Sequence, residues 1–215
     1  MSFLNQLKNQ ASELQKQQTA QVRDIEGNTA KCEAAARTVH HYLGELARQL
    51  NVISPDGPRL TLDGKTPWPA MKLVNFRSDA RKKMLRDKEC YDFIAVGWDI
   101  LPKIGAPVGG VVAVNFPPDL ERVQSRLSVG MVEHERKEVR HPESNKLQAY
   151  RFEYITKSRG SITATPEHDK GTVAFRLVDV DGFGVQNVSY PAEQIRESLL
   201  DEMAKLVVGQ PSKFI

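Results

Sequence analysis

The residues best suited to nucleophilic or metal chemistry are few and widely spaced. The cysteines, Cys32 and Cys90, are far apart, and the adjacent pair His40 and His41 points about 100° apart on a helix, so it does not chelate one ion as an i, i+4 pair does. Cys90 and a distant histidine are the residue types of a nucleophilic pair. The sequence around Cys90 (KECYDF), however, contains no nucleophile motif. We therefore predict no metal site, no cofactor and no catalytic residue.

One short motif invites a phosphate-binding interpretation. Gly64-Lys65-Thr66 ends like a P-loop, but the motif needs a glycine five residues before Gly64, where this chain has Arg59. A helix should also begin at the lysine and threonine, whereas Pro67 follows. The sequence favours a turn at Asp63-Gly64 after a short strand.

The other chemical templates fail as well. Gly105, Gly109 and Gly110 precede an apolar strand and not the helix that a dinucleotide site needs. Asp179-x-Asp181 begins like a calcium loop, but valine stands where the bidentate carboxylate belongs. A small-molecule pocket near the two tryptophans and the Gly105–Gly110 loop remains an alternative. Without a template that fits, we expect a non-enzymatic protein.

A basic segment is the sharpest charge feature. If it is a short helix, as we predict for residues 77–88, its cations project toward solvent and are able to contact the phosphates of a nucleotide or nucleic acid. No aromatic residue lies between them to stack on bases. The six predicted phosphate-binding residues are Arg77, Arg81, Lys82, Lys83, Arg86 and Lys88.

The N-terminal residues form a thin heptad pattern. Apolar residues occupy successive a and d positions, except that Gln18 and Gln21 fill one pair. Such a seam has too little apolar surface to stabilise a helix unless another surface covers it, and we predict a protein interface or self-association there. The alternative is that the segment packs on its own domain or frays at its end. The predicted interface residues are Leu4, Leu7, Leu14 and Ile25.

A second stretch, residues 29–51, has a fuller apolar stripe at the 3.6-residue period. Gly27 lies between the two stretches. Either they form an antiparallel helical hairpin or Gly27 is tolerated inside one long helix. The region 1–51 is thus predicted to be helical.

Most of the remaining chain has strand patterns. Residues 52–71, rich in Pro and Gly, predict a linker, and residues 91–101 predict a central strand buried on both faces. Pro117 opens a helix, and the later strands are separated by turns at 141–145, at Arg159-Gly160 and at Asp181-Gly182. Pro191 begins a C-terminal helix that Gly209 ends.

These patterns predict an α+β fold in which a mainly antiparallel domain, residues 72–215, follows the helical region and the linker. The 215 residues carry 30 Lys and Arg against 27 Asp and Glu, with 40% hydrophobic residues, which excludes a disordered or polyelectrolyte chain. No secretory signal or membrane span is apparent, so we predict a cytoplasmic protein. Its expected role is protein–protein contact or self-association; the alternative is nucleic-acid or nucleotide-phosphate binding through residues 77–88.

Overall fold

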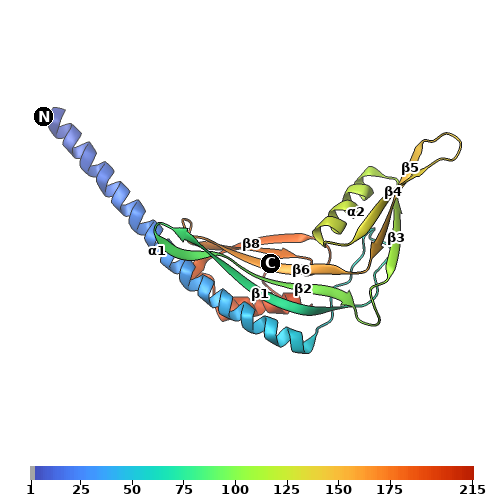
Figure 1. Ribbon diagram of the computed structural model, residues 1–215. Coiled ribbons are helices and arrows are strands. Elements are labelled where there is room, and N and C mark those ends of the chain that lie inside the picture. The colour runs from blue at the N-terminus through green and yellow to red at the C-terminus, as the bar shows by residue number, and fades with distance from the viewer. Residues whose placement is uncertain (1–2) are drawn as a thin grey trace.

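The protein has an α+β fold, seen in a computed structural model that describes the backbone of residues 3–215 and the side chains of residues 8, 12–15 and 24 onward (Figure 1). One long helix comes first, followed by antiparallel strands with one internal helix and a C-terminal helix. The elements are α1 (Phe3–Ile53), β1 (Met71–Leu85), β2 (Lys88–Pro102), β3 (Gly109–Val114), α2 (Pro117–Val129), β4 (His134–Arg140), β5 (Leu147–Ile155), β6 (Ser158–Glu167), β7 (Thr172–Val178), β8 (Val185–Pro191), a 3₁₀ turn (Ala192–Gln194) and α3 (Glu197–Val207).

The described strands form two antiparallel sheets. The larger has the order β1-β2-β6-β7-β8, and the smaller has the order β3-β5-β4. The predicted central strand, residues 91–101, is part of β2 and pairs with β1 on one side and β6 on the other. This strand therefore lies in the interior of the larger sheet, as predicted, but its residues alternate between buried and partly buried, so the predicted burial on both faces is wrong.

The N-terminal region is one helix and not a hairpin. At 1.5 Å per residue, its 51 residues span about 75 Å. Gly27 is inside it, and a β-carbon there would meet nothing within 4 Å. The glycine is thus tolerated in the helix interior without a close contact that requires it.

The main core lies between the larger sheet and two helices. The second half of α1 runs under this sheet beside α3 (Figure 1). Its buried side chains repeat at the helical period, so one face of the helix covers the sheet. They are Cys32, Ala35, Ala36, Val39, Leu43, Ala47 and Leu50, and α3 adds Leu200, Met203 and Val207.

The predicted basic helix is wrong. Residues 71–85 form strand β1, and Arg86 and Asp87, both with positive φ, make the tight turn into β2. The spacing of Ala80 and Met84 suits a helix, but pairing with the apolar strand β2 decides the outcome. β1 is an edge of the sheet, where lysines and arginines disfavour pairing with a strand of another chain.

Two predicted turns differ in detail. Arg159-Gly160 lies within β6, since the missing side chain of Gly160 leaves room for the Trp98 ring, whose atoms would be 2.3–2.6 Å from an added β-carbon. Asp181-Gly182 does lie between paired strands, but the connection spans residues 179–184 and is longer than a two-residue turn.

The β4–β5 ribbon projects from the far end of the molecule (Figure 1). Every residue of β4 is exposed, and the predicted loop 141–145 lies at the tip of the ribbon. On β5, Phe152 and Tyr154 are buried, while the guanidinium of Arg136 lies 3.9 Å from the centre of the Tyr150 ring. Two of these three aromatic side chains of β5, those of Phe152 and Tyr154, therefore belong to the core.

The segment predicted as a linker contributes Leu60, Leu62 and Trp68 to the core. The predicted C-terminal helix is present as α3, but a 3₁₀ turn precedes it and it begins at Glu197. None of the described helices combines the length and the apolar character needed to cross a membrane.

Candidate functional site

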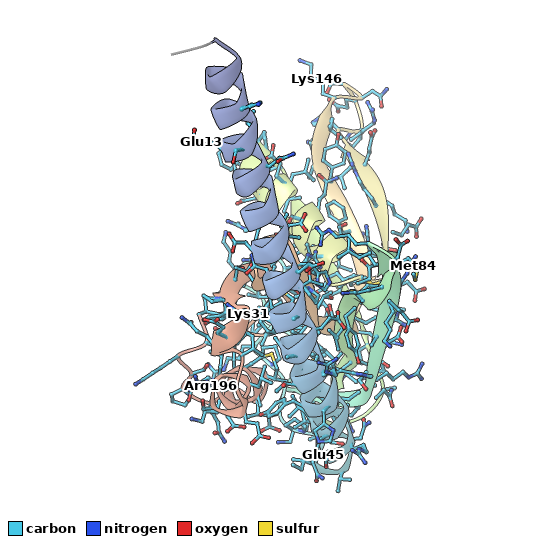
Figure 2. The ribbon with its side chains drawn as sticks, turned by 90° about the vertical axis from the view of Figure 1, so that its left-hand side faces the viewer. Glu13, Lys31, Glu45, Met84, Lys146 and Arg196 are labelled. Carbon is cyan, nitrogen blue, oxygen red and sulfur yellow. The ribbon has the colours of Figure 1, made fainter. Side chains whose placement is uncertain are left out.

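The first half of α1 extends beyond the rest of the molecule. We call residues 3–24 the N-terminal arm; Figure 1 shows it leaving the end of the larger sheet, and Figure 2 shows Glu13 on the arm, with Lys31 and Glu45 further along the same helix. After the arm, Asn28 Nδ2 of α1 donates a hydrogen bond to the carbonyl oxygen of Asp169, at 3.1 Å. Lys31 then forms an ion pair with Glu193 at 2.5 Å. These contacts hold the part of α1 that follows the arm against the rest of the molecule.

Two of the predicted interface residues have described side chains. Leu14 is 59% exposed, whereas Ile25, at the base of the arm, is partly buried. The side chains of Leu4 and Leu7 lie outside the described residues, although their backbone belongs to α1. A helix has neighbours at i+3 and i+4, so the heptad places all four positions along one side of α1.

Most of the basic segment is neutralised by acidic neighbours. Lys82 bonds Glu89 at 3.0 Å, Lys83 bonds Asp92 at 2.8 Å, and Arg81 lies 3.8 Å from the same Asp92. Arg86 is paired with Asp169, and Lys88 lies exposed beside the turn. The structure thus does not gather the six predicted cations into one unopposed positive surface.

Arg77 is in a different place from the other five. It pairs with Gly97 of β2, which pairs with Ser161 of β6, which in turn pairs with Val178 of β7. Residues directly opposite in neighbouring strands point to the same face, so this row lies on the face away from α1. That face forms the floor of a cleft of about 610 Å³, closed on one side by the end of α2.

Three arginines line the cleft against one carboxylate. Arg159 lies 3.4 Å from Asp99, which also accepts a hydrogen bond from Asn75 at 2.9 Å. Arg77 and Arg176 form no ion pair with any described residue. The floor of the cleft therefore carries a positive charge that the protein does not balance, which suits an anionic ligand.

A buried carboxyl lies behind this cleft. Asp179 is 1% exposed, accepts a hydrogen bond from the Ser158 hydroxyl at 3.0 Å, and accepts another from the Gly184 amide at 2.9 Å. Burial raises the pKa of Asp179 to about 6, against the opposing effect of these two hydrogen bonds. The Ser158 hydroxyl oxygen also lies 3.0 Å from the carbonyl oxygen of Gly130 at the end of α2, so its single proton is shared between these two acceptors. Asp179 thus helps fix the wall of the cleft.

Sequence reasoning missed Arg159, Arg176 and Asp99. They come from three different strands, and their meeting depends on the pairing of β2, β6 and β7. One signal was available for Arg176, because a single charged residue interrupts the apolar strand TVAFRLV. In a strand buried on both faces that position would be apolar, so the arginine indicates an open face.

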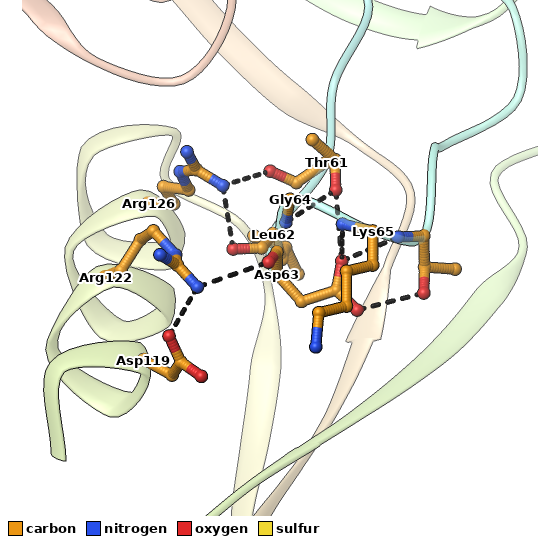
Figure 3. A network of polar contacts seen from close by, with 9 residues as sticks. Thr61, Leu62, Asp63, Gly64, Lys65, Asp119, Arg122 and Arg126 are labelled. Carbon is orange, nitrogen blue, oxygen red and sulfur yellow. Dashed lines mark hydrogen bonds and ion pairs between the residues drawn. The ribbon is translucent and has the colours of Figure 1, made fainter. Parts of the chain in front are cut away.

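The turn that resembles a P-loop has a structural role (Figure 3). Asp63 accepts hydrogen bonds from the amides of Lys65 and Thr66, while Arg126 of α2 donates to the carbonyls of Thr61 and Leu62. Burial alone would raise the pKa of Asp63, but the hydrogen bonds outweigh it and lower that pKa to about 2. These contacts confirm the predicted turn. The backbone amides that would bind a phosphate in a P-loop already donate to the carboxylate of Asp63.

The structure brings Cys90 close to His168, a pairing that sequence spacing did not predict. Burial raises the pKa of the Cys90 thiol, and the nearby carboxylate of Glu33 raises it further. The thiol therefore stays protonated at neutral pH, unlike an activated nucleophile.

In comparisons with known proteins, no protein family, curated protein or solved structure matches the chain.

Proposed function

We propose that this protein works through protein–protein contact, and that two copies associate through their N-terminal arms. The observation that carries the proposal is the exposure of the arm: Leu14, on the heptad seam, is 59% exposed on a helix that continues past the domain. Most of the stability of a helix in a protein comes from packing of its apolar face, and pairing with a second helix would supply that contact to the arm.

The composition of the arm suits a second copy of itself. Its charged residues are Lys8, Glu13, Lys16, Arg23 and Asp24, so both signs are present and two arms side by side do not strongly repel each other. Gln18 and Gln21 interrupt the apolar seam. Polar residues at such positions favour one register and oligomer at a cost in affinity, so the expected complex is a weak and specific one.

The mass of the full chain in solution tests this proposal. Light scattering during gel filtration is expected to give a mass that rises from monomer to dimer with concentration. Leu14→Asp is expected to shift the midpoint of that transition to at least tenfold higher concentration, because a charge enters the apolar seam.

Ser12→Asp is the matched control, since it adds the same charge two residues away and off the seam, at another exposed position. It should leave the transition where it is. A monomer at every concentration, or equal effects of the two substitutions, would contradict self-association through this seam.

A second candidate function is the binding of a phosphate-bearing ligand, a nucleotide or nucleic acid, in the arginine-lined cleft. The unpaired Arg77 and Arg176 on the cleft floor support it. Of the basic segment, only Arg77 takes part in this revised site. Binding of a fluorescently labelled oligonucleotide or nucleotide should weaken steeply as salt is raised.

Charge-reversal variants distinguish binding in the cleft from binding to the rest of the basic segment. Arg77→Glu and Arg176→Glu should each weaken binding at least tenfold, while Lys82→Glu, at a residue already paired with Glu89, should change it less than twofold. If all three variants lost the same affinity, binding would depend on the overall surface charge and not on the cleft. Binding that does not change with salt would contradict phosphate recognition.

A further inference from the structure

One face of the larger sheet is not covered by the described helices, apart from α2 at its end. α1 and α3 lie on the other face (Figure 1). We call the face away from α1 the open face. In its middle, the side chains that β2, β6 and β7 direct outward are small or hydroxylated, so this face can stay in contact with water. They are Ala95, Gly97, Ser161, Thr163 and Ala174.

Two unopposed cations lie on opposite sides of these small residues. Arg77 is on β1 and Arg176 is on β7, and both point to the open face. Their strands are three spacings apart in the sheet, which places the two backbones about 14 Å from each other. Neither guanidinium forms an ion pair with a described residue. The open face thus has two separate positions for negative charge.

Hydroxyl groups lie between the two arginines. Ser161 and Thr163 are on β6, and Thr163 is directly opposite Arg176. Among the described residues, neither hydroxyl has a hydrogen-bond partner. Hydroxyl and guanidinium groups are common donors to the phosphates of a nucleic-acid backbone. This part of the face therefore offers a row of donors to a phosphodiester chain.

The acidic residues of the open face limit where such a chain can lie. Asp99 is already paired with Arg159 at 3.4 Å. Asp79 is exposed in the same row as Arg176, but at the β1 edge of the sheet. A diagonal path from Arg77 over β6 to Arg176 leaves one of these carboxylates on each side. The path itself carries cations and hydroxyl groups.

We infer that the ligand of the arginine-lined cleft is a single strand of nucleic acid, whose backbone crosses the open face on this diagonal from β1 toward β8. The inference rests on the second function proposed above, phosphate binding in that cleft. A chain brings one phosphate to each arginine, whereas a nucleoside monophosphate has a single phosphate to offer. The cleft, of about 610 Å³, is the size of a site for a drug-sized molecule and is too small to enclose a duplex.

Affinity as a function of oligonucleotide length tests this inference on the full chain. Competition against a fluorescently labelled thymidylate oligomer of about ten nucleotides compares the unlabelled oligomer with thymidine monophosphate. Ten equivalent positions alone would give the oligomer about a tenfold advantage, and we expect at least a hundredfold, since the second phosphate binds intramolecularly. Its affinity should also fall more steeply with salt, by a slope of about 0.7 for each further phosphate bound.

A uridylate oligomer of the same length is the RNA counterpart. The same gain with either oligomer supports the inference, because DNA and RNA share the phosphodiester backbone that the open face would contact.

Two threonines of β6 provide a matched pair of variants. Thr163 lies on the diagonal, whereas Thr165 lies on the same strand and face, opposite Ala174 and outside the diagonal. Thr163→Val removes a donor without changing the shape of the side chain and should weaken binding of the oligomer about tenfold. Thr165→Val makes the same change and should alter it less than twofold. Circular dichroism checks that both variants are folded.

The outcomes separate this inference from the function on which it rests. If the oligomer gains no more than about tenfold over the monophosphate and has the same salt slope, the single-strand ligand is wrong, although phosphate binding in the cleft stands. If neither probe binds, both proposals fail. Tighter binding of a duplex of the same length would contradict a single strand, and equal effects of the two threonine substitutions would contradict the diagonal path.

Discussion

The two halves of α1 belong to one helix and yet have opposite surroundings. From Ile25 onward the helix covers the larger sheet, with Val39 and Leu43 fully buried, whereas Leu14 of the N-terminal arm is 59% exposed. Both halves have apolar residues at helical spacing. The docked half is also rich in alanine on its buried face, which lets the helix approach the strands closely.

The difference teaches that spacing determines which side of a helix is apolar, while the density of apolar residues determines whether that side is buried within the chain. In the docked half almost every inward position is apolar. In the arm, Gln18 and Gln21 interrupt the seam. The docked half should therefore respond to substitution through the stability of the domain, and the arm through association.

Removing a leucine from each half gives the largest expected contrast. Leu43→Ala should lower the free energy of unfolding by about 2–5 kcal/mol, because it opens a cavity in the core. Leu14→Ala should change it by less than about 0.5 kcal/mol. Urea unfolding followed by the fluorescence of Trp68 and Trp98, both in the domain, measures this. Similar losses in the two variants would mean that the arm is part of the same cooperative unit.

A second contrast comes from pH, through Asp179 of the domain. Its folded pKa of about 6 lies above the usual 3.8, so its contribution to stability is complete below about pH 4 and is lost as pH rises through 6. The change amounts to about 3 kcal/mol. Asp179→Asn, which tolerates the positive φ of 52° at this position, should remove this pH dependence.

Asp181→Asn is the control for that experiment, as it changes an exposed acid of the same connection. Urea unfolding at several values between pH 4 and 7 gives the slope for each variant. If the slope in Asp179→Asn equals that of the unmodified chain, then burial of this carboxyl is not its source.

Asp63 should have the opposite pH dependence and a smaller effect. Its pKa of about 2 lies below the usual 3.8, so it stabilises the fold above about pH 4, and that contribution is lost as pH falls through 2. Asp63→Ala should cost about 2 kcal/mol at neutral pH. Asp119→Asn, in an exposed pair with Arg122, should cost less than about 0.5 kcal/mol when measured by the same urea unfolding.

Sequence patterns predicted the local elements better than the places where elements meet. The helical stripe of residues 29–51, the strand at 91–101 and the turn at Asp63-Gly64 depend on neighbours in sequence, and each is present. The basic segment was assigned to a helix because its local spacing allows one. It is a strand because it pairs with β2, and that pairing cannot be predicted from the local sequence of the segment.

The same reason limits what sequence reveals about the sites. The heptad of the arm lies within one segment, so the sequence alone is enough to predict an interface there. The cleft joins Arg77 with Arg176, and a second group brings Glu33 close to Cys90 and His168; in both, strand pairing or helix docking brings together residues far apart in the chain. No spacing rule covers such cases, so these groups appear only with the fold.

The smallest expected effect tests whether the two halves of α1 unfold as one unit. Gly27 lies near the junction between them and Gly44 in the docked half, and a β-carbon meets nothing within 4 Å at the first and only Ser78 Oγ at 3.8 Å at the second. Alanine at either position should favour the helix by about 0.5–1 kcal/mol. Gly44→Ala should raise the urea midpoint of the domain, whereas Gly27→Ala should leave that midpoint unchanged and slow hydrogen exchange in the amides around residue 27. An equal rise of the midpoint in both variants would show that the arm and the docked half unfold together, because only then does added helix stability at the junction reach the domain.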